Sequence, residues 1–213
     1  MSSRASALSL SILLLVVAPS QASDRPQPSM LANDELTGWM PDGAQVETRL
    51  DADVTGDGLR DLVFVARSDD TRVLKVLVGY ATEVDMGFDP LGEMRMGDSP
   101  LGDATLSVKK GVLIVEDLDG GTTAIQSLYR FRFDAKARRF RLIGDDVSLY
   151  SRTNAHDMTS MSTNRLTGVQ IVKRSVVGED GYTDQPEQKK TVPTRPIYME
   201  DAPSPAETLG WGD

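Results

Sequence analysis

Apolar residues occur along this chain in short runs whose spacing is typical of β-strands. Residues 62–66 are apolar without interruption, which predicts a strand covered on both faces, and residues 73–80 form a second run after a polar turn. Residues 129–133 alternate between aromatic side chains and arginines, and residues 139–142 continue the alternation. Neighbouring residues of a strand point to opposite faces, so the aromatic side is expected in the core and the arginine side at the surface. The predicted core side chains are Tyr129, Phe131, Phe133, Phe140 and Leu142, and the predicted arginine face consists of Arg130, Arg132, Arg139 and Arg141.

Turn residues separate further strands. Residues 105–108 and 112–115 have the pattern of a hairpin, and Asp119-Gly120-Gly121 is expected to form the next hairpin turn. Residues 81–104 contain several Gly, Asp and Met residues without a period, so a long loop is expected there. The whole pattern predicts an all-β fold of mostly antiparallel sheets, either sandwich-like or like part of a propeller.

The two ends of the chain differ from the β region. Residues 1–22 have the parts of a secretory signal peptide, namely Arg4, an apolar stretch too short to span a membrane, and a small-x-small cleavage site. The chain is therefore expected to be a soluble periplasmic or secreted protein that does not insert into membranes. The expected divisions are a signal peptide at 1–22, an N-terminal lead with a short helix at 23–50, the β domain at 51–200 and a flexible tail at 201–213.

Composition narrows the classes of partner. The chain has 213 residues, a formal net charge of −9 and no Cys. An acidic protein is repelled by phosphate backbones, so nucleic acid is not expected as a partner. Because no disulfide can form, stability has to come from the core and from any ion that binds the folded state.

One short stretch before residues 62–66 carries closely spaced oxygen-bearing side chains. These belong to Asp53, Thr55, Asp57 and Asp61, with Gly56 and Gly58 between them where the backbone has to turn. Ca²⁺ takes about six to eight oxygen ligands, and a tight Asp/Gly loop can supply several of them. The alternative is an acidic turn that is only solvated. The regular spacing favours the calcium site.

This stretch resembles two known calcium loops. Its first nine positions follow an EF-hand loop, but Phe64 stands where that loop places a bidentate Glu, and no helix flanks it. Residues 53–65 are more similar to the calcium loops of integrin-like FG-GAP (VCBS-type) repeats. They match the pattern Asp-x-Asn-x-Asp-Gly-x-x-Asp-apolar except at Thr55. The ligands that the resemblance implies are Asp53, Thr55, Asp57, the Leu59 carbonyl and Asp61, with water completing the shell and Asp51 as an additional outer group.

The other candidates for catalysis are a single histidine and several paired acids. The single His, His156, precedes Asp157, but strand neighbours point to opposite faces, which favours a loop histidine over a catalytic one. Paired acids are abundant, and turn-associated acids are favoured over a glycosidase pair. Residues 116–121 could form a degenerate second cation loop, but they lack the downstream Asp, which favours a hairpin turn.

The arginine face has two interpretations. It could dock an anionic polysaccharide or another partner on an otherwise acidic protein. Alternatively, its arginines pair with acidic neighbours across the strands, which is the favoured interpretation because solvated charged faces are common.

Three further segments carry a second resemblance. Residues 129–133, 140–145 and 162–168 resemble segments of exported bacterial proteins of unknown function, which also carry a single Asp/Gly calcium-type loop. That resemblance implies no activity. The sequence therefore predicts an exported β domain with one structural Ca²⁺ site, acting as a binding or interaction module in the cell envelope for an unknown protein or polysaccharide. The alternative is a Ca²⁺-dependent envelope hydrolase acting on glycan or phosphate substrates, for which no catalytic residue is assigned.

Overall fold

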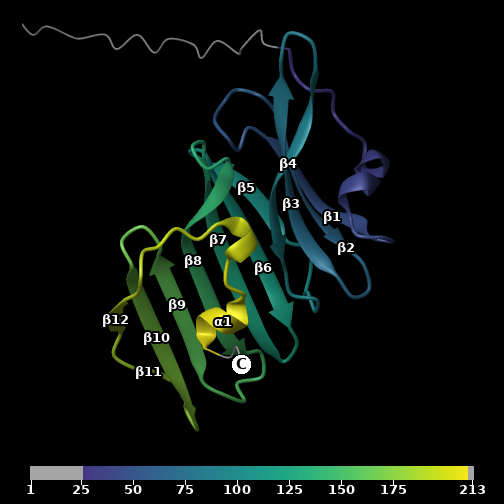
Figure 1. The fold of residues 1–213 in the computed structure, drawn as a ribbon. Helices are drawn as coiled ribbons and strands as arrows, with labels where there is room; N and C mark the ends of the chain where they lie inside the picture. The colour runs from purple at the N-terminus through teal and green to yellow at the C-terminus, as the bar shows by residue number, and fades with distance from the viewer. Residues whose placement is uncertain (1–25, 211–213) are drawn as a thin grey trace, which may run out of the picture.

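The computed structural model describes residues 26–210 and has two open antiparallel sheets, which confirms the predicted all-β fold class (Figure 1). The first sheet has its four strands in chain order. They are β1 (Gln45–Ala52), β2 (Asp61–Arg67), β3 (Arg72–Ala81) and β4 (Met86–Arg95). The expected signal peptide, residues 1–22, lies outside the described residues.

The second sheet follows in the chain and is the larger of the two. Its strands are β5 (Thr105–Lys109), β6 (Val112–Gly120), β7 (Thr123–Asp134), β8 (Arg139–Ser151), β9 (Met158–Asn164), β10 (Val169–Gly178), β11 (Gly181–Asp184) and β12 (Gln188–Thr191). They lie in the order β11-β10-β9-β8-β7-β6-β5, and β12 pairs with β10 beside β11. The hairpins expected around residues 109–111 and 119–121 are both present.

The main core lies between the two sheets, as in a sandwich. Val63, Leu74 and Val76 of the first sheet are fully buried in one cluster with Leu113, Phe131, Phe140 and Leu142 of the second. Burying such apolar side chains is the main favourable term in folding. The sandwich alternative therefore describes the arrangement of the sheets.

The opposite face of the first sheet is covered by the N-terminal lead. The 3-10 helix η1 (Asn33–Trp39) places Leu36 against Phe64 and Leu77, and all three are fully buried. The Glu35 carboxylate accepts a hydrogen bond from the Ala32 N–H (2.6 Å), which caps the start of η1. The lead thus contains a short 3-10 helix, and β2 is covered on both faces.

The predicted register of β7 and β8 is confirmed. Tyr129, Phe131, Phe140 and Leu142 are buried, and Phe133 is half-buried at the end of β7. On the opposite face Arg132 is exposed, and Arg130 and Arg141 are half-buried. The aromatic side therefore faces the core, as the alternation predicted.

The expected long loop over residues 81–104 is wrong, because β4 occupies its middle. β4 is an edge strand that pairs only with β3. Pro90 lies at the register shift of this pairing, and an edge strand tolerates a residue without an N–H there. Gly92 faces the core, where a Cβ would lie 2.9 Å from the Met199 sulfur and 3.2 Å from the Phe140 ring. Pro90 and Gly92 interrupt the alternation of apolar and polar residues in β4, which is why the sequence pattern did not predict this strand.

The C-terminal segment, residues 192–210, crosses the second sheet and returns to the core (Figure 1, yellow). The Leu142 N–H donates to the Ile197 carbonyl (2.9 Å), and Met199 of the 3-10 helix η2 (Met199–Asp201) is fully buried between the sheets. The Tyr129 hydroxyl donates to the Pro203 carbonyl (2.9 Å), and the short helix α1 (Pro205–Leu209) follows. The described part of the expected tail, residues 201–210, thus contains α1 and contacts the sheet.

No helix within residues 26–210 is long and apolar enough to cross a membrane.

Candidate functional site

The Asp loop, residues 53–61, connects β1 to β2 with a tightly turned backbone. Gly56 and Gly58 have φ values of +82° and +86°, the left-handed region that side-chain-bearing residues rarely adopt. Val54 and Leu59, on either side of these glycines, are 1% and 4% exposed and fix the loop to the protein. The alternation of small, acidic and apolar residues thus gives a loop with buried anchors and polar side chains between them.

Asp61 closes the loop from inside the protein. Its side chain is fully buried, and its carboxylate accepts hydrogen bonds from the N–H groups of Val54 (2.8 Å), Thr55 (3.1 Å) and Gly79 (2.9 Å). Asp61 is also the first residue of β2, so its hydrogen bonds join the loop to β2 and to β3. Burial, with a smaller contribution from the Asp57 charge, raises the pKa of Asp61 to about 6 against the effect of these three donors.

The other two carboxylates of the loop point toward its own backbone. Asp53 accepts hydrogen bonds from the N–H groups of Gly56 (2.6 Å) and Gly58 (2.9 Å), and from the Thr55 hydroxyl (3.3 Å). Asp57 accepts one from the Leu59 N–H (2.8 Å). Such bonds from a carboxylate to N–H groups a few residues later stabilise a tight turn.

Gln27, in the N-terminal lead, holds the outer side of the loop. Its side-chain amide donates to the Gly58 carbonyl (3.0 Å) and accepts from the Arg60 N–H (2.9 Å). Nothing in the sequence pattern indicated this role, because the two segments lie about 30 residues apart. Asp51, the expected outer group, pairs instead with Arg49 (2.8 Å).

The donor set of the loop suits a hard cation, because it consists of carboxylates, a hydroxyl and backbone carbonyls. Within residues 26–210, however, no three acidic, His or Cys side chains converge as a metal-holding group. The carboxylates of Asp53, Asp57 and Asp61 serve the backbone of the loop instead. An ion at the loop would therefore also need Thr55, the Leu59 carbonyl and water among its ligands.

A groove of about 540 Å³, the loop groove, runs beside the Asp loop. Its lining includes Thr55 and Asp57 of the loop, together with Phe133, Ala135 and Arg138 at the end of β7 and the following turn. The loop therefore borders a concave surface that both sheets help to form.

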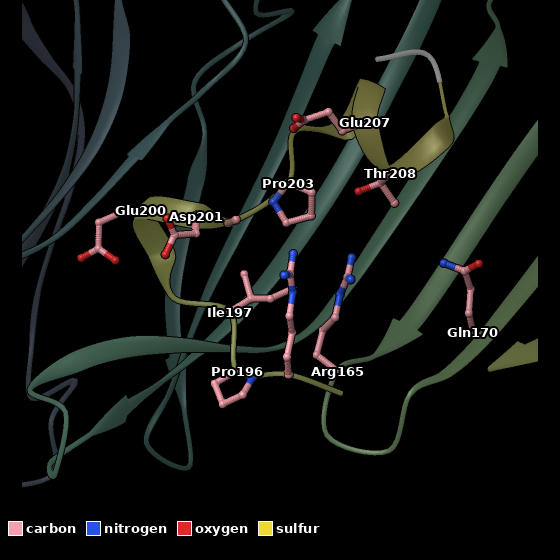
Figure 2. A pocket seen from close by; sticks show the side chains of 11 residues that line it. Arg165, Gln170, Pro196, Ile197, Glu200, Asp201, Pro203, Glu207 and Thr208 are labelled. Atoms are coloured by element: carbon pink, nitrogen blue, oxygen red, sulfur yellow. The ribbon is translucent and has the colours of Figure 1, made fainter. Parts of the chain in front are cut away.

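A second cavity, of about 880 Å³, lies between the second sheet and the C-terminal segment (Figure 2). Figure 2 shows Arg165, in the turn between β9 and β10, with Glu207 and Thr208 across the cavity. Arg165 is paired with the fully buried Asp145 (2.9 Å), and Glu207 accepts a hydrogen bond from the Ser204 N–H (2.7 Å) at the start of α1. These charges are therefore already engaged, Arg165 within the second sheet and Glu207 in the capping of α1.

The remaining candidates have structural partners. His156 contacts the Thr123 hydroxyl (2.8 Å) and the Asp157 carbonyl (2.7 Å), while the Asp157 carboxylate accepts from the Val177 N–H (3.0 Å). His156 lies in the loop between β8 and β9. The expected hairpin is present, but its turn is Gly121-Thr122, because Asp119 and Gly120 still pair with Ile125 and Ala124 in the strands.

The arginine face is only partly neutralised by acidic neighbours. Arg130 pairs with Asp146 (2.7 Å), and Arg139 pairs with Glu200 (2.9 Å) and with Asp201 (3.2 Å). Arg139 also stacks over the Tyr198 ring at 4.1 Å. The other two arginines of the face make no salt bridge with any residue in the described range 26–210.

Comparisons of the chain with protein-family models, with curated proteins and with solved structures found no match.

Proposed function

We propose that this chain is an exported, soluble β domain with one structural Ca²⁺ site in the Asp loop, and that it serves as a binding module in the cell envelope. The ligands would be Asp53, Thr55, Asp57, the Leu59 carbonyl and Asp61, as the resemblance to FG-GAP-type loops implies. The proposed export rests on the signal-peptide pattern of residues 1–22 and places the protein in the periplasm or outside the cell.

The buried Asp61 carboxylate carries the calcium proposal. A buried charge is unfavourable unless it is paired, and the partners of Asp61 are neutral N–H groups. The charge of another acid, Asp57, adds repulsion and contributes to the raised pKa of Asp61. A cation at the loop would offset both effects, and oxygen ligands of this kind favour Ca²⁺.

A structural role fits the position of the loop better than a catalytic one. Asp61 is both a proposed ligand and the first residue of β2, whose side chains fill the core on both faces. An ion held there would stabilise the start of that strand. Because it would bind only the folded state, its stabilisation would grow with RT ln(1 + [Ca²⁺]/Kd).

The test is thermal unfolding of the mature protein after chelation, with and without millimolar Ca²⁺. We expect Ca²⁺ to raise the melting temperature of the wild type and to raise that of Asp57→Asn far less. Asp180→Asn is the matched control, because it also removes one exposed negative charge but lies in the distant β10–β11 turn. A wild-type melting temperature that does not respond to Ca²⁺ would refute the site.

The hydrolase alternative makes a different prediction for Asp61→Ala. If the ion is structural, this variant unfolds at a lower temperature and loses partner binding together with its fold. An unchanged melt in Ca²⁺, combined with loss of a measured hydrolytic activity, would make the ion catalytic and replace the binding-module proposal.

A further inference from the structure

Two arginines of the arginine face lie directly opposite each other on neighbouring strands. Arg132 of β7 is in register with Arg141 of β8, so both side chains stand on the same face of the sheet. Like charges in this position destabilise a strand pair. Arg130 and Arg139 of the same face are neutralised by acidic partners, whereas these two arginines form no salt bridge within the described residues.

The pair lines a cavity of about 310 Å³, which we call the arginine cavity. Ile143 and Leu166 form apolar parts of its wall. The Nε atom of Arg141 is buried and has no hydrogen-bond partner in the part of the chain that the structure describes. A buried donor without a partner is unfavourable, and a ligand oxygen in the cavity would satisfy it.

The one acidic side chain in the lining of this cavity is already engaged. The Asp134 carboxylate accepts hydrogen bonds from the N–H groups of Lys136 and Ala137 (3.1 Å each) and from the Tyr198 hydroxyl (3.3 Å). The Ala137 N–H is the main cause of a lowered pKa of Asp134, so the group stays ionised at neutral pH. Two arginines against one carboxylate leave the cavity cationic, in a protein whose formal net charge is −9.

The arginine cavity lies next to the loop groove, since Phe133 and Ala135 line both of them. The two arginines of the cavity stand on the outer face of the β7–β8 hairpin and Phe133 on its core face, so the two concave surfaces lie on either side of the hairpin end. The loop groove offers polar groups of both signs, because Arg138 pairs there with Asp89 (3.0 Å). A ligand that follows both would be extended, with an anionic group at one end and neutral polar groups beyond it.

We propose that the arginine cavity binds the anionic group of an acidic polysaccharide, whose neighbouring sugar units lie along the loop groove past Phe133. A carboxylate or sulfate accepts parallel hydrogen bonds from a planar guanidinium, and two arginines fixed on adjacent strands can hold one group from both sides. This binding would remove the repulsion between Arg132 and Arg141. The inference rests on the proposed binding role and names its ligand class; it does not depend on the calcium site.

The experiment measures binding of a hyaluronate hexasaccharide, in which charged and neutral sugars alternate, by isothermal titration calorimetry at low ionic strength. The full mature protein is compared with Arg132→Gln, Arg141→Gln and the double variant. Arg130→Gln is the matched control, because it removes the same charge from the same strand face but its guanidinium already has Asp146 as a partner. Neutral dextran oligosaccharide and sodium sulfate serve as ligand controls.

We expect each cavity variant to weaken hyaluronate binding by about tenfold or more, as loss of a charged hydrogen-bonding partner implies. Arg130→Gln should change the affinity far less, and dextran should not bind. Melting temperatures of the variants confirm that they are folded, so that a loss of binding reports on the site.

Three results would overturn the inference. The first is that hyaluronate does not bind the wild type. The second is that all arginine variants lose affinity equally, as in nonspecific charge attraction, and the third is that sulfate binds where hyaluronate does not. If hyaluronate does not bind while Ca²⁺ still raises the melting temperature, only the proposed ligand class is wrong. If hyaluronate binds and Ca²⁺ has no effect, the calcium site is wrong and the polysaccharide site stands.

Discussion

Arg72 joins the two sheets through a buried cluster of charges, and its replacement is the most informative test of the fold. The Arg72 side chain is 1% exposed at the start of β3. It donates hydrogen bonds to Glu47 of β1 (2.6 and 2.7 Å) and to Asp117 of β6 (2.8 and 2.9 Å). Arg72→Met keeps an unbranched side chain but removes the charge and all of these donors.

The expected loss follows from what the substitution leaves behind. The side chains of Glu47 and Asp117 are 3% and 6% exposed, so water cannot replace the guanidinium. Removing one partner of a buried ion pair costs about 3–5 kcal/mol, because an uncompensated buried charge remains. For a chain of this size each kcal/mol lowers the melting temperature by about 2–4 °C, so a decrease of about 6–20 °C is expected.

The loss of stability in Arg72→Met should depend on pH. Burial alone would raise the pKa of Glu47, but hydrogen bonds from the Arg72 side chain and the Ala104 N–H outweigh it and lower the pKa below the usual value of 4.5. A carboxyl with a lowered folded-state pKa contributes stability above its unfolded pKa and loses it as pH falls through the folded value. Without Arg72 burial dominates and the Glu47 carboxyl protonates more readily. The difference between wild type and Arg72→Met should therefore be large at pH 7 and shrink below about pH 4.5.

Urea unfolding followed by circular dichroism at neutral and acidic pH measures both effects. Lys75→Met is the matched control, since Lys75 lies on the same strand but pairs with the exposed Glu93. Exposed pairs contribute about 0–1 kcal/mol. If Arg72→Met is no more destabilising than Lys75→Met, or if its effect is the same at both pH values, the cluster does not stabilise the fold as argued.

Two other substitutions test the core and the lead. Phe131→Ala removes a fully buried ring between the sheets and should lower the free energy of unfolding by about 3–5 kcal/mol in urea; a loss below about 1 kcal/mol would contradict its place in the core. Gln27→Ala removes the two hydrogen bonds to the Asp loop and should lower stability by about 1 kcal/mol and weaken the response of the melting temperature to Ca²⁺. An unchanged melt and an unchanged response would mean that the lead does not support the loop.

The amino-acid sequence by itself determined the features that depend on short-range periodicity. Alternation over residues 129–133 decides which face of β7 is buried, because the geometry of a strand assigns neighbours to opposite sides. The unbroken apolar run at the start of β2 requires cover on both faces, which η1 and the second sheet supply. The spacing of acids and glycines likewise determined where the chain forms the Asp loop.

Only the tertiary structure decided which charged and polar groups meet. Arg72 and Asp117 stand 45 positions apart, and nothing in either neighbourhood marks them as partners. The arginine face shows the same limit: Arg130 lies beside Asp146, while Arg132 lies opposite Arg141. These pairings follow from strand register and from the bulge near Arg130, which are set by packing across the whole sheet. Local periodicity assigns a side chain to a face, and the long-range fold then determines its neighbour.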